Sequence, residues 1–209
     1  MRILIDGMDL SGKTTLSHRL VHRMEARGLR VRHTRLTLYG GLHARLVRVA
    51  YRNLPPGSLL CAWAFAFAAL VDRMLDLVAP VGTWDVHIHE AHAAHTAAYA
   101  AGFGHRRTAA VLEAARWLWP RFGHILLLTA RPTTRRVRLA QRSDNDANDM
   151  LLVLEPLRFH RIEARLADTL MEMGATVIET DRLGVEAVES VALDSIGILT
   201  GIGSTRKAG

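Results

Sequence analysis

One stretch near the N-terminus decides how this chain folds: Gly7-Met8-Asp9-Leu10-Ser11-Gly12-Lys13-Thr14. It fits the pattern G-x-x-x-x-G-K-[ST] without a mismatch, and it follows a short apolar segment at residues 2–6 that predicts a strand. A helical pattern over residues 14–27 comes next, and Gly28 supplies the left-handed cap that commonly ends a helix. Strand, glycine loop and helix in this order predict a loop that wraps around phosphate groups.

The composition of the loop follows from the chemistry of phosphate binding. Gly7 and Gly12 let the backbone come close enough for its N–H groups to face phosphate oxygens, and the positive end of the next helix favours the anion. Lys13 can reach the β- and γ-phosphates, and the Thr14 hydroxyl can ligate Mg²⁺. We therefore expect ATP and Mg²⁺ to bind here. The residues expected to bind the nucleotide are Gly7, Leu10, Ser11, Gly12, Lys13, Thr14 and Thr15.

The rest of the chain alternates short strands with helices, which predicts an α/β P-loop NTPase fold: a doubly wound, five-stranded parallel sheet flanked by helices. Strands are expected at 2–6, 30–36, 85–89, 124–129 and 176–179. Helices are expected at 14–27, 42–52, 58–78, 105–118, 132–142, 151–174 and 185–199. No linker or internal repeat divides the 209 residues, so we expect one domain over 1–200, with a mobile lid near 142–150 and a flexible tail at 201–209.

Charge and composition narrow the functional classes. The net charge is +7, and of the 27 basic residues only Lys13 and Lys207 are lysines. The charge is spread thinly and no aromatic residues interleave with it, which argues against nucleic acid as a partner. The lone Cys61 suits a reducing, cytoplasmic location. The apolar run 59–71 is too short to span a membrane, so no membrane partner is expected.

With these residues in view, the chain resembles the thymidylate kinase family of P-loop nucleotide kinases. The block 6–15 is similar to that family's E-G-x-D-G-x-G-K-T-T opening, and Asp9 stands where the family's loop acid meets the acceptor. Asp72-Arg73 looks like its D-R element, whose arginine grips the acceptor phosphate. Residues 84–90 resemble the strand that leads into its D-R-Y motif, and Thr96 with Tyr99 resembles its S-x-x-A-Y segment. Residues 34–36 resemble its T-R-E-P-G-G motif, and Arg138 with Arg142 resembles its lid. The resemblance implies acceptor contacts from Asp9, Arg35, Arg73 and Tyr99, and lid arginines Arg138 and Arg142 that act in catalysis.

Most departures from the family fall on the acceptor half of the predicted site, and one falls in the lid. Ala91 stands where a phosphate-binding arginine belongs, and Ala147 stands where a further lid arginine would be. Ala69 occupies the position of the aromatic residue that stacks on thymine, and Phe67 is the nearby aromatic that could line an acceptor pocket instead. The ATP half therefore looks intact, and dTMP itself is not the favoured acceptor.

Glu90, at a strand end, has two chemical roles open to it. It could hold Mg²⁺ as the Walker B carboxylate does, or it could act as general base on an acceptor hydroxyl. His87, His89, His92 and His95 surround it without a metal-ligand spacing. Of these, His92, or His89, could face the acceptor. In the basic segment 131–142, Arg135 and Arg136 are expected on a solvated helix face, while Arg138 and Arg142 share another face.

The sequence thus predicts an ATP-dependent phosphotransferase that phosphorylates a nucleoside, a nucleotide or another small hydroxyl- or phosphate-bearing molecule. Its catalytic residues would be Lys13, Glu90, Arg138 and Arg142, with Thr14 and Glu90 at the metal. A genuine dTMP kinase is one alternative, and a nucleotide-binding regulatory ATPase or switch is another of a different class. The long apolar helix at 58–78 would permit a homodimer.

Overall fold

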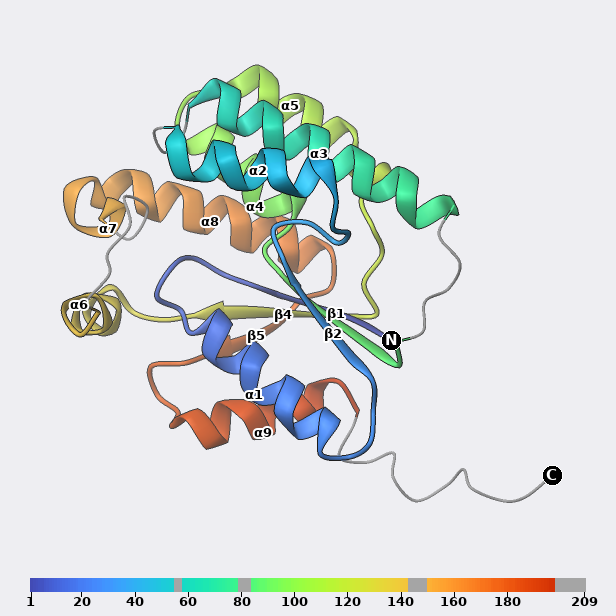
Figure 1. Ribbon diagram of the computed structural model, residues 1–209. Coiled ribbons are helices and arrows are strands. Elements are labelled where there is room, and N and C mark those ends of the chain that lie inside the picture. The colour runs from blue at the N-terminus through green and yellow to red at the C-terminus, as the bar shows by residue number, and fades with distance from the viewer. Residues whose placement is uncertain (55–57, 79–83, 143–149, 198–209) are drawn as a thin grey trace.

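The computed structural model describes residues 1–54, 58–78, 84–142 and 150–197 (Figure 1). Its strands form one five-stranded parallel sheet in the order β2-β3-β1-β4-β5, which confirms the predicted fold class. Each strand begins and ends within one residue of the expected position. The strands are β1 (Arg2–Asp6), β2 (Val31–Arg35), β3 (Val86–Glu90), β4 (His124–Thr129) and β5 (Thr176–Glu179).

Helices connect these strands, and most of them match the expected segments. The predicted single helix 151–174 is wrong, because the chain leaves the helical conformation at Glu155, the residue before Pro156. The predicted helix 105–118 ends early and continues as a short 3₁₀ turn. The helices are α1 (Lys13–Glu25), α2 (Leu42–Asn53), α3 (Leu59–Val78), α4 (Ala93–Gly102), α5 (Arg106–Ala114), η1 (Arg116–Leu118), α6 (Pro132–Ala140), α7 (Leu151–Leu154), α8 (Pro156–Glu172) and α9 (Val185–Ser195).

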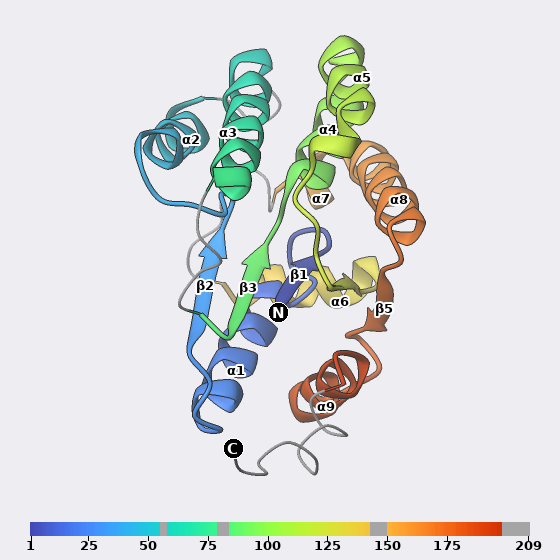
Figure 2. The same cartoon turned by 90° about the vertical axis from the view of Figure 1, so that its right-hand side faces the viewer.

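Two hydrophobic layers hold the helices to the sheet, one on each face. Successive side chains of a strand point to opposite faces, so Ile3 and Ile5 pack with α1 and α9, whereas Leu4 packs with α4 and α8. Figures 1 and 2 show α1 and α9 on one side of the sheet and the larger helical layer, with α2, α3, α4, α5 and α8, on the other. The sheet is therefore doubly wound, as the sequence predicts.

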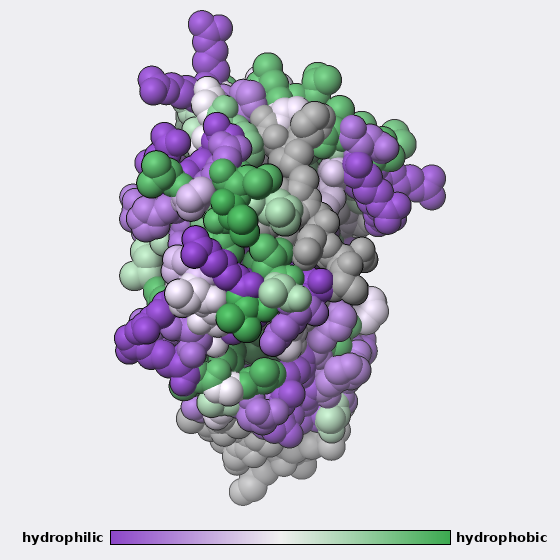
Figure 3. Space-filling view, turned by 90° about the vertical axis from the view of Figure 1, so that its left-hand side faces the viewer, coloured by the Kyte–Doolittle hydropathy of each residue, from purple (hydrophilic) through white to green (hydrophobic). Residues whose placement is uncertain are grey.

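The carboxyl ends of the strands meet at one end of the molecule, on the left in Figure 1. In open parallel sheets this is where ligands bind. Figure 3 views the protein from this end, where hydrophobic residues gather along the middle of the face and hydrophilic residues project at its edges. The phosphate loop at 7–12 joins β1 to α1 at this end of the sheet.

Two parts of the prediction lie beyond what the structure describes. Most of the expected lid at 142–150 and the whole expected tail at 201–209 are outside the described residues. Within the described residues, no helix combines the length and the apolar character needed to cross a membrane.

Candidate functional site

The phosphate loop depends on glycine for steric reasons. Gly7 has a φ of 147°, and a Cβ atom there would lie 2.2 Å from the carbonyl oxygen of Leu128 on β4. Gly12, with a φ of 100°, precedes the first residue of α1. Leu10 also has a positive φ, 65°, which is a strained conformation for a residue with a side chain. The loop backbone thus packs against the carboxyl end of β4 and leaves the N-terminus of α1 open.

Lys13 is folded back over this loop. Its ammonium group donates hydrogen bonds to the carbonyl oxygens of Gly7 at 2.7 Å and Met8 at 3.0 Å, and lies 3.5 Å from Asp9 Oδ1. The side chain is buried, with 7% of the residue exposed. These contacts place the positive charge inside the loop, where an anionic ligand bound by the loop amides would meet it.

Thr14 and Glu90 form the oxygen-rich side of the site. The Thr14 hydroxyl donates to Glu90 Oε2 at 2.9 Å, and His33 Nε2 lies 2.8 Å from Glu90 Oε1. Burial raises the pKa of the Glu90 carboxyl, but the hydrogen bonds from His33 and Thr14 outweigh it and leave the pKa below its usual value. A deprotonated carboxylate beside a hydroxyl is a donor set that suits Mg²⁺. No cluster of three or more histidine, cysteine or acidic side chains able to hold a metal occurs in the described part of the chain.

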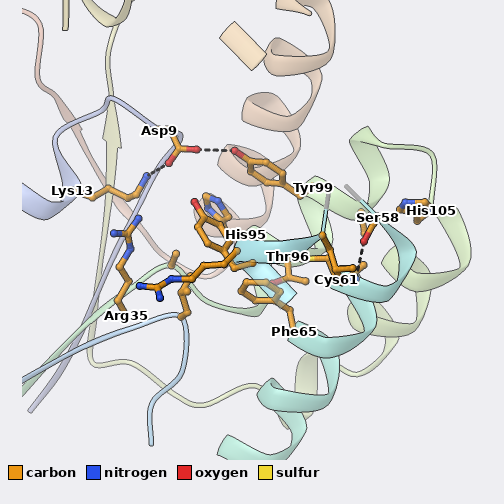
Figure 4. A pocket seen from close by; sticks show the side chains of 17 residues that line it. Asp9, Lys13, Arg35, Ser58, Cys61, Phe65, His95, Thr96, Tyr99 and His105 are labelled. Atoms are coloured by element: carbon orange, nitrogen blue, oxygen red, sulfur yellow. Dashed lines mark hydrogen bonds and ion pairs between the residues drawn. The ribbon is translucent and has the colours of Figure 1, made fainter. Parts of the chain in front are cut away.

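A cavity of about 410 Å³, here called the Tyr99 cavity, opens on one side of the loop (Figure 4). Figure 4 shows Asp9, Lys13 and Arg35 on one side of it, with Ser58 and His105 on the opposite side. Tyr51 of α2, Leu54, and Phe65 of α3 supply part of its apolar wall. Its lining residues are Asp9, Lys13, Arg35, Leu36, Tyr51, Arg52, Leu54, Ser58, Cys61, Ala62, Phe65, Ala91, His95, Thr96, Tyr99, Ala100 and His105.

Asp9 ties the loop to α4 inside this cavity. Its Oδ2 accepts a hydrogen bond of 3.0 Å from the Tyr99 hydroxyl, while its Oδ1 faces Lys13. Burial alone would raise the pKa of the Asp9 carboxyl, but Lys13, His95 and Tyr99 lower it below its usual value. Asp9 is therefore a carboxylate whose two oxygens both have partners in this structure.

A second cavity, the Arg138 cavity, lies on the other side of the same loop and has a volume of about 290 Å³. Arg138 donates to Leu10 O at 2.8 Å and to Thr180 O at 2.9 Å, which fixes its guanidinium beside the loop. Burial, followed by the nearby Arg135 charge, lowers the pKa of Arg138. The cavity lining is Leu10, Gly12, Thr15, Leu16, Arg138, Arg142, Thr180, Leu183, Val185 and Val188. The two predicted lid arginines thus lie together, beside Gly12 and Thr15.

The structure separates several predicted residues from the site. Arg73 does not line either cavity, and its Nη1 donates to Asp76 on the next turn of α3 at 3.3 Å. His92 is 5% exposed and packs edge-on against His89 and Phe122 instead of lining the Tyr99 cavity. Burial lowers the pKa of His92 to about 4, so it is neutral near pH 7.

Two further expectations about side-chain exposure are corrected. Arg135 is not on a solvated face: it is fully buried, forms an ion pair with Glu163 on α8, and lies 5.0 Å over the Phe159 ring. Phe67 is 52% exposed, and Phe65 is the aromatic residue of α3 that lines the Tyr99 cavity.

Sequence reasoning missed a pair of residues that the structure places at the cavity. His95, on the first turn of α4, lines the Tyr99 cavity, and its Nδ1 lies 2.9 Å from Asp6 Oδ1 at the end of β1. Asp6 is fully buried and also accepts a hydrogen bond from the Gly7 amide at 2.8 Å. The sequence contained one signal for this pair. Asp6 is the last residue of β1 and His95 follows β3, and the carboxyl ends of these neighbouring parallel strands lie together.

Comparison with solved structures identifies the fold. The thymidylate kinase of Candida albicans superposes with a TM-score of 0.66 at 15% sequence identity, over 95% of this chain and 92% of that one. The thymidylate kinase of Ehrlichia chaffeensis gives a TM-score of 0.63 at 19% identity, over 96% and 98% of the two chains. No family model and no curated protein matches the sequence. Along nearly its whole length, the chain therefore has the fold of thymidylate kinases.

Proposed function

We propose that this protein is an ATP-dependent phosphotransferase that transfers the γ-phosphate of ATP to a small acceptor molecule other than plain dTMP. One observation carries the proposal: the phosphate loop and the first turn of α1 line two different cavities. Asp9 and Lys13 line the Tyr99 cavity, whereas Leu10, Gly12 and Thr15 line the Arg138 cavity. Direct transfer requires two small molecules bound on either side of one phosphate-binding loop.

The chemistry assigned to each side follows from its residues. ATP would occupy the Arg138 cavity with its phosphates in the loop, where Arg138 and Arg142 can neutralise charge on the transferring group. Thr14 and Glu90 would hold Mg²⁺, which when bound neutralises charge on the β- and γ-phosphate oxygens. Glu90 does not line the Tyr99 cavity but is hydrogen-bonded to Thr14, the other expected Mg²⁺ ligand, so we favour the metal role over the general-base role.

The acceptor would occupy the Tyr99 cavity, against Asp9, Arg35 and Tyr99. Ala91 lines this cavity where an arginine would bind an acceptor phosphate in the resembled family. The aromatic wall is supplied by Phe65, two turns of α3 before Arg73, and the position of Ala69 does not line the cavity. The wall that would contact a thymine base therefore differs from the resembled pattern, which supports an acceptor other than dTMP.

The direct test is a transfer assay with ATP, Mg²⁺ and a panel of nucleosides, nucleoside monophosphates and small alcohols, with products identified by mass. We expect one class of acceptor to gain one phosphoryl group while ADP forms in equal amount. Lys13→Ala should abolish the transfer. Transfer unaffected by Lys13→Ala would contradict the proposal, and dTMP as the best acceptor would contradict the assignment of the acceptor.

The same assay separates this proposal from a regulatory ATPase or switch. A switch would release inorganic phosphate at a rate independent of every acceptor, because water would be the only nucleophile. The 410 Å³ cavity beside Lys13 favours transfer, because a switch has no need for a second small-molecule site there.

A further inference from the structure

We propose that His95, oriented by Asp6, is the general base that removes a proton from an acceptor hydroxyl in the Tyr99 cavity. This inference rests on the proposed function and narrows it: the acceptor would be an alcohol, not a phosphate monoester. The juxtaposition that carries it is a buried carboxylate behind a histidine whose ring lines the cavity beside Lys13 and Asp9.

The hydrogen bonds fix how the His95 ring carries its proton. Asp6 Oδ1 accepts the Gly7 amide proton at 2.8 Å and lies 2.9 Å from His95 Nδ1, and an ionised carboxylate can only accept hydrogen bonds. The proton of a neutral His95 therefore sits on Nδ1, and the lone pair is on Nε2. This is the orientation and tautomer that a carboxylate imposes on a catalytic histidine.

The ring is held from a second direction as well. His95 stacks on the Tyr99 ring, with centroids 4.8 Å apart and planes 20° apart, and Tyr99 is itself bound to Asp9. His95 Nε2 makes no hydrogen bond within the described residues, although 18% of the side chain is exposed. A fixed ring with an accessible lone pair in a ligand-sized cavity can accept a proton.

Other candidate bases at this site are occupied. Both oxygens of Glu90 are engaged by Thr14 and His33, outside the Tyr99 cavity. Asp9 lies between Lys13 and Tyr99, and its lowered pKa makes it a weak base. His95 is the described residue of the cavity that combines a free lone pair with a buried carboxylate behind it.

The need for a base indicates which acceptor the cavity takes. A phosphate monoester attacks through an oxygen that carries no proton near neutral pH, so it needs no base. An alcohol must lose its proton as it attacks. In the balanced step, the hydroxyl proton moves to His95 Nε2, the acceptor oxygen bonds to the γ-phosphorus, and the bond from that phosphorus to the β,γ-bridging oxygen breaks. ADP leaves with the electron pair, and the imidazolium then returns its proton to solvent.

The apolar wall supports the same class of acceptor. Leu54, Cys61, Phe65 and Ala100 line the cavity. Figure 4 shows Cys61 and Phe65 on the side away from Asp9 and Lys13. They suit the body of a nucleoside or another small alcohol with an apolar or aromatic part.

The test compares matched acceptors: thymidine, deoxycytidine and adenosine against their 5′-monophosphates, with glycerol as a small alcohol. We expect transfer to a hydroxyl compound that exceeds transfer to its monophosphate. His95→Ala should then lower kcat by about 10² to 10⁴ with the KM for ATP unchanged, because it removes a proton acceptor and not a nucleotide contact. His160→Ala, an exposed histidine on α8, is the matched control and should leave the rate unchanged.

The pH profile gives a readout that a structural role for His95 would not change. The wild-type rate should fall on the acid side as one group gains a proton, and this limb should be absent from the residual activity of His95→Ala. The charged or titratable groups that face the ring or share its cavity are Asp6, Asp9, Lys13, Arg35, Arg52, Cys61, Tyr99 and His105. An acid limb that persists in His95→Ala would overturn the inference.

The outcomes also separate this inference from the proposed function. If a monophosphate is the best acceptor and His95→Ala keeps its kcat, the inference fails and the kinase remains. If no acceptor gains phosphate, the proposed kinase activity toward this panel fails, and the pairing of Asp6 with His95 is then tested by NMR alone. Long-range proton–nitrogen spectra should show the neutral His95 ring protonated at Nδ1, and the opposite tautomer would overturn the inference.

Discussion

Replacing Asp72 should destabilise the protein through the segment that leads into α2, without affecting the nucleotide side. Asp72 is 1% exposed, and its carboxylate accepts from Leu38 N at 2.6 Å, from Tyr39 N at 3.0 Å and from His43 Nε2 at 3.0 Å. It thereby fastens α3 to the chain between β2 and α2. The sequence placed it in a substrate-binding element, whereas the structure shows it binding protein groups.

The cost of Asp72→Ala can be worked from these contacts. The Leu38 amide and the His43 ring are buried and would lose their acceptor, at about 1 to 3 kcal/mol each. Tyr39 is half-buried, so its amide can turn to water at lower cost. Burial raises the pKa of Asp72, which shows that its charge is unfavourable there and that removing it returns part of the loss. We expect a net loss of about 3 kcal/mol.

Urea denaturation followed by circular dichroism measures this loss. With a denaturant slope of about 2 kcal/mol per molar urea, the midpoint should fall by about 1.5 M. Asp168→Ala, an exposed carboxylate on α8, is the matched control and should shift stability by less than about 0.5 kcal/mol. ATP affinity should change less than about twofold, because Asp72 lines neither cavity. A loss below about 1 kcal/mol would refute the reasoning.

Three further changes test other parts of the site. Gly7→Ala should weaken ATP binding at least about tenfold, because its Cβ would meet the Leu128 carbonyl; Gly28→Ala, where a Cβ meets nothing within 4 Å, should leave binding unchanged in the same titration. Glu90→Gln should lower kcat about 100-fold while Mg²⁺-free ATP binding is retained; equal loss of both would indicate a structural role. Burial lowers the pKa of His87 to about 4, below its unfolded value of 6.5. Between these two pH values the unfolded chain binds a proton at His87 that the folded protein does not bind, so the stability of the folded protein falls as the pH falls from 6.5 to 4. About 2 kcal/mol should disappear between pH 7 and pH 5, and His87→Gln should flatten that slope.

The strands and the phosphate loop could be predicted from local sequence patterns, because each has a recognisable pattern of its own. The run at 124–129 predicts a strand buried on both faces, and β4, like β1, contributes side chains to both hydrophobic layers. The role of Lys13 follows from the loop spacing, because the motif G-x-x-x-x-G-K-[ST] after a strand places its lysine where it can reach bound phosphates.

Side-chain directions at the helix layer could not be predicted in the same way. Arg135 looks solvated by helical spacing, but its environment is set by Glu163 and Phe159, which α8 brings from later in the chain. His92 and His95 point in different directions because of a turn at Ala91, which has a φ of 53°. After this turn His92 packs in the core beside Phe122, and His95 lines the cavity. A single positive φ at a residue other than glycine has no reliable sequence signal.

The net charge of +7 also acquires a structural interpretation. Most arginines with a described partner pair with this protein's own acids, as Arg135 does with Glu163 and Arg165 does with Glu113. Arg35 and Arg52 line the Tyr99 cavity, and neither makes a hydrogen bond or an ion pair among the described residues. Both side chains are exposed, and the Arg35 charge helps to lower the pKa of the neighbouring Asp9 carboxyl. Much of the arginine content is therefore used in ion pairs within the protein, so the net charge by itself does not indicate a polymeric anion as a partner.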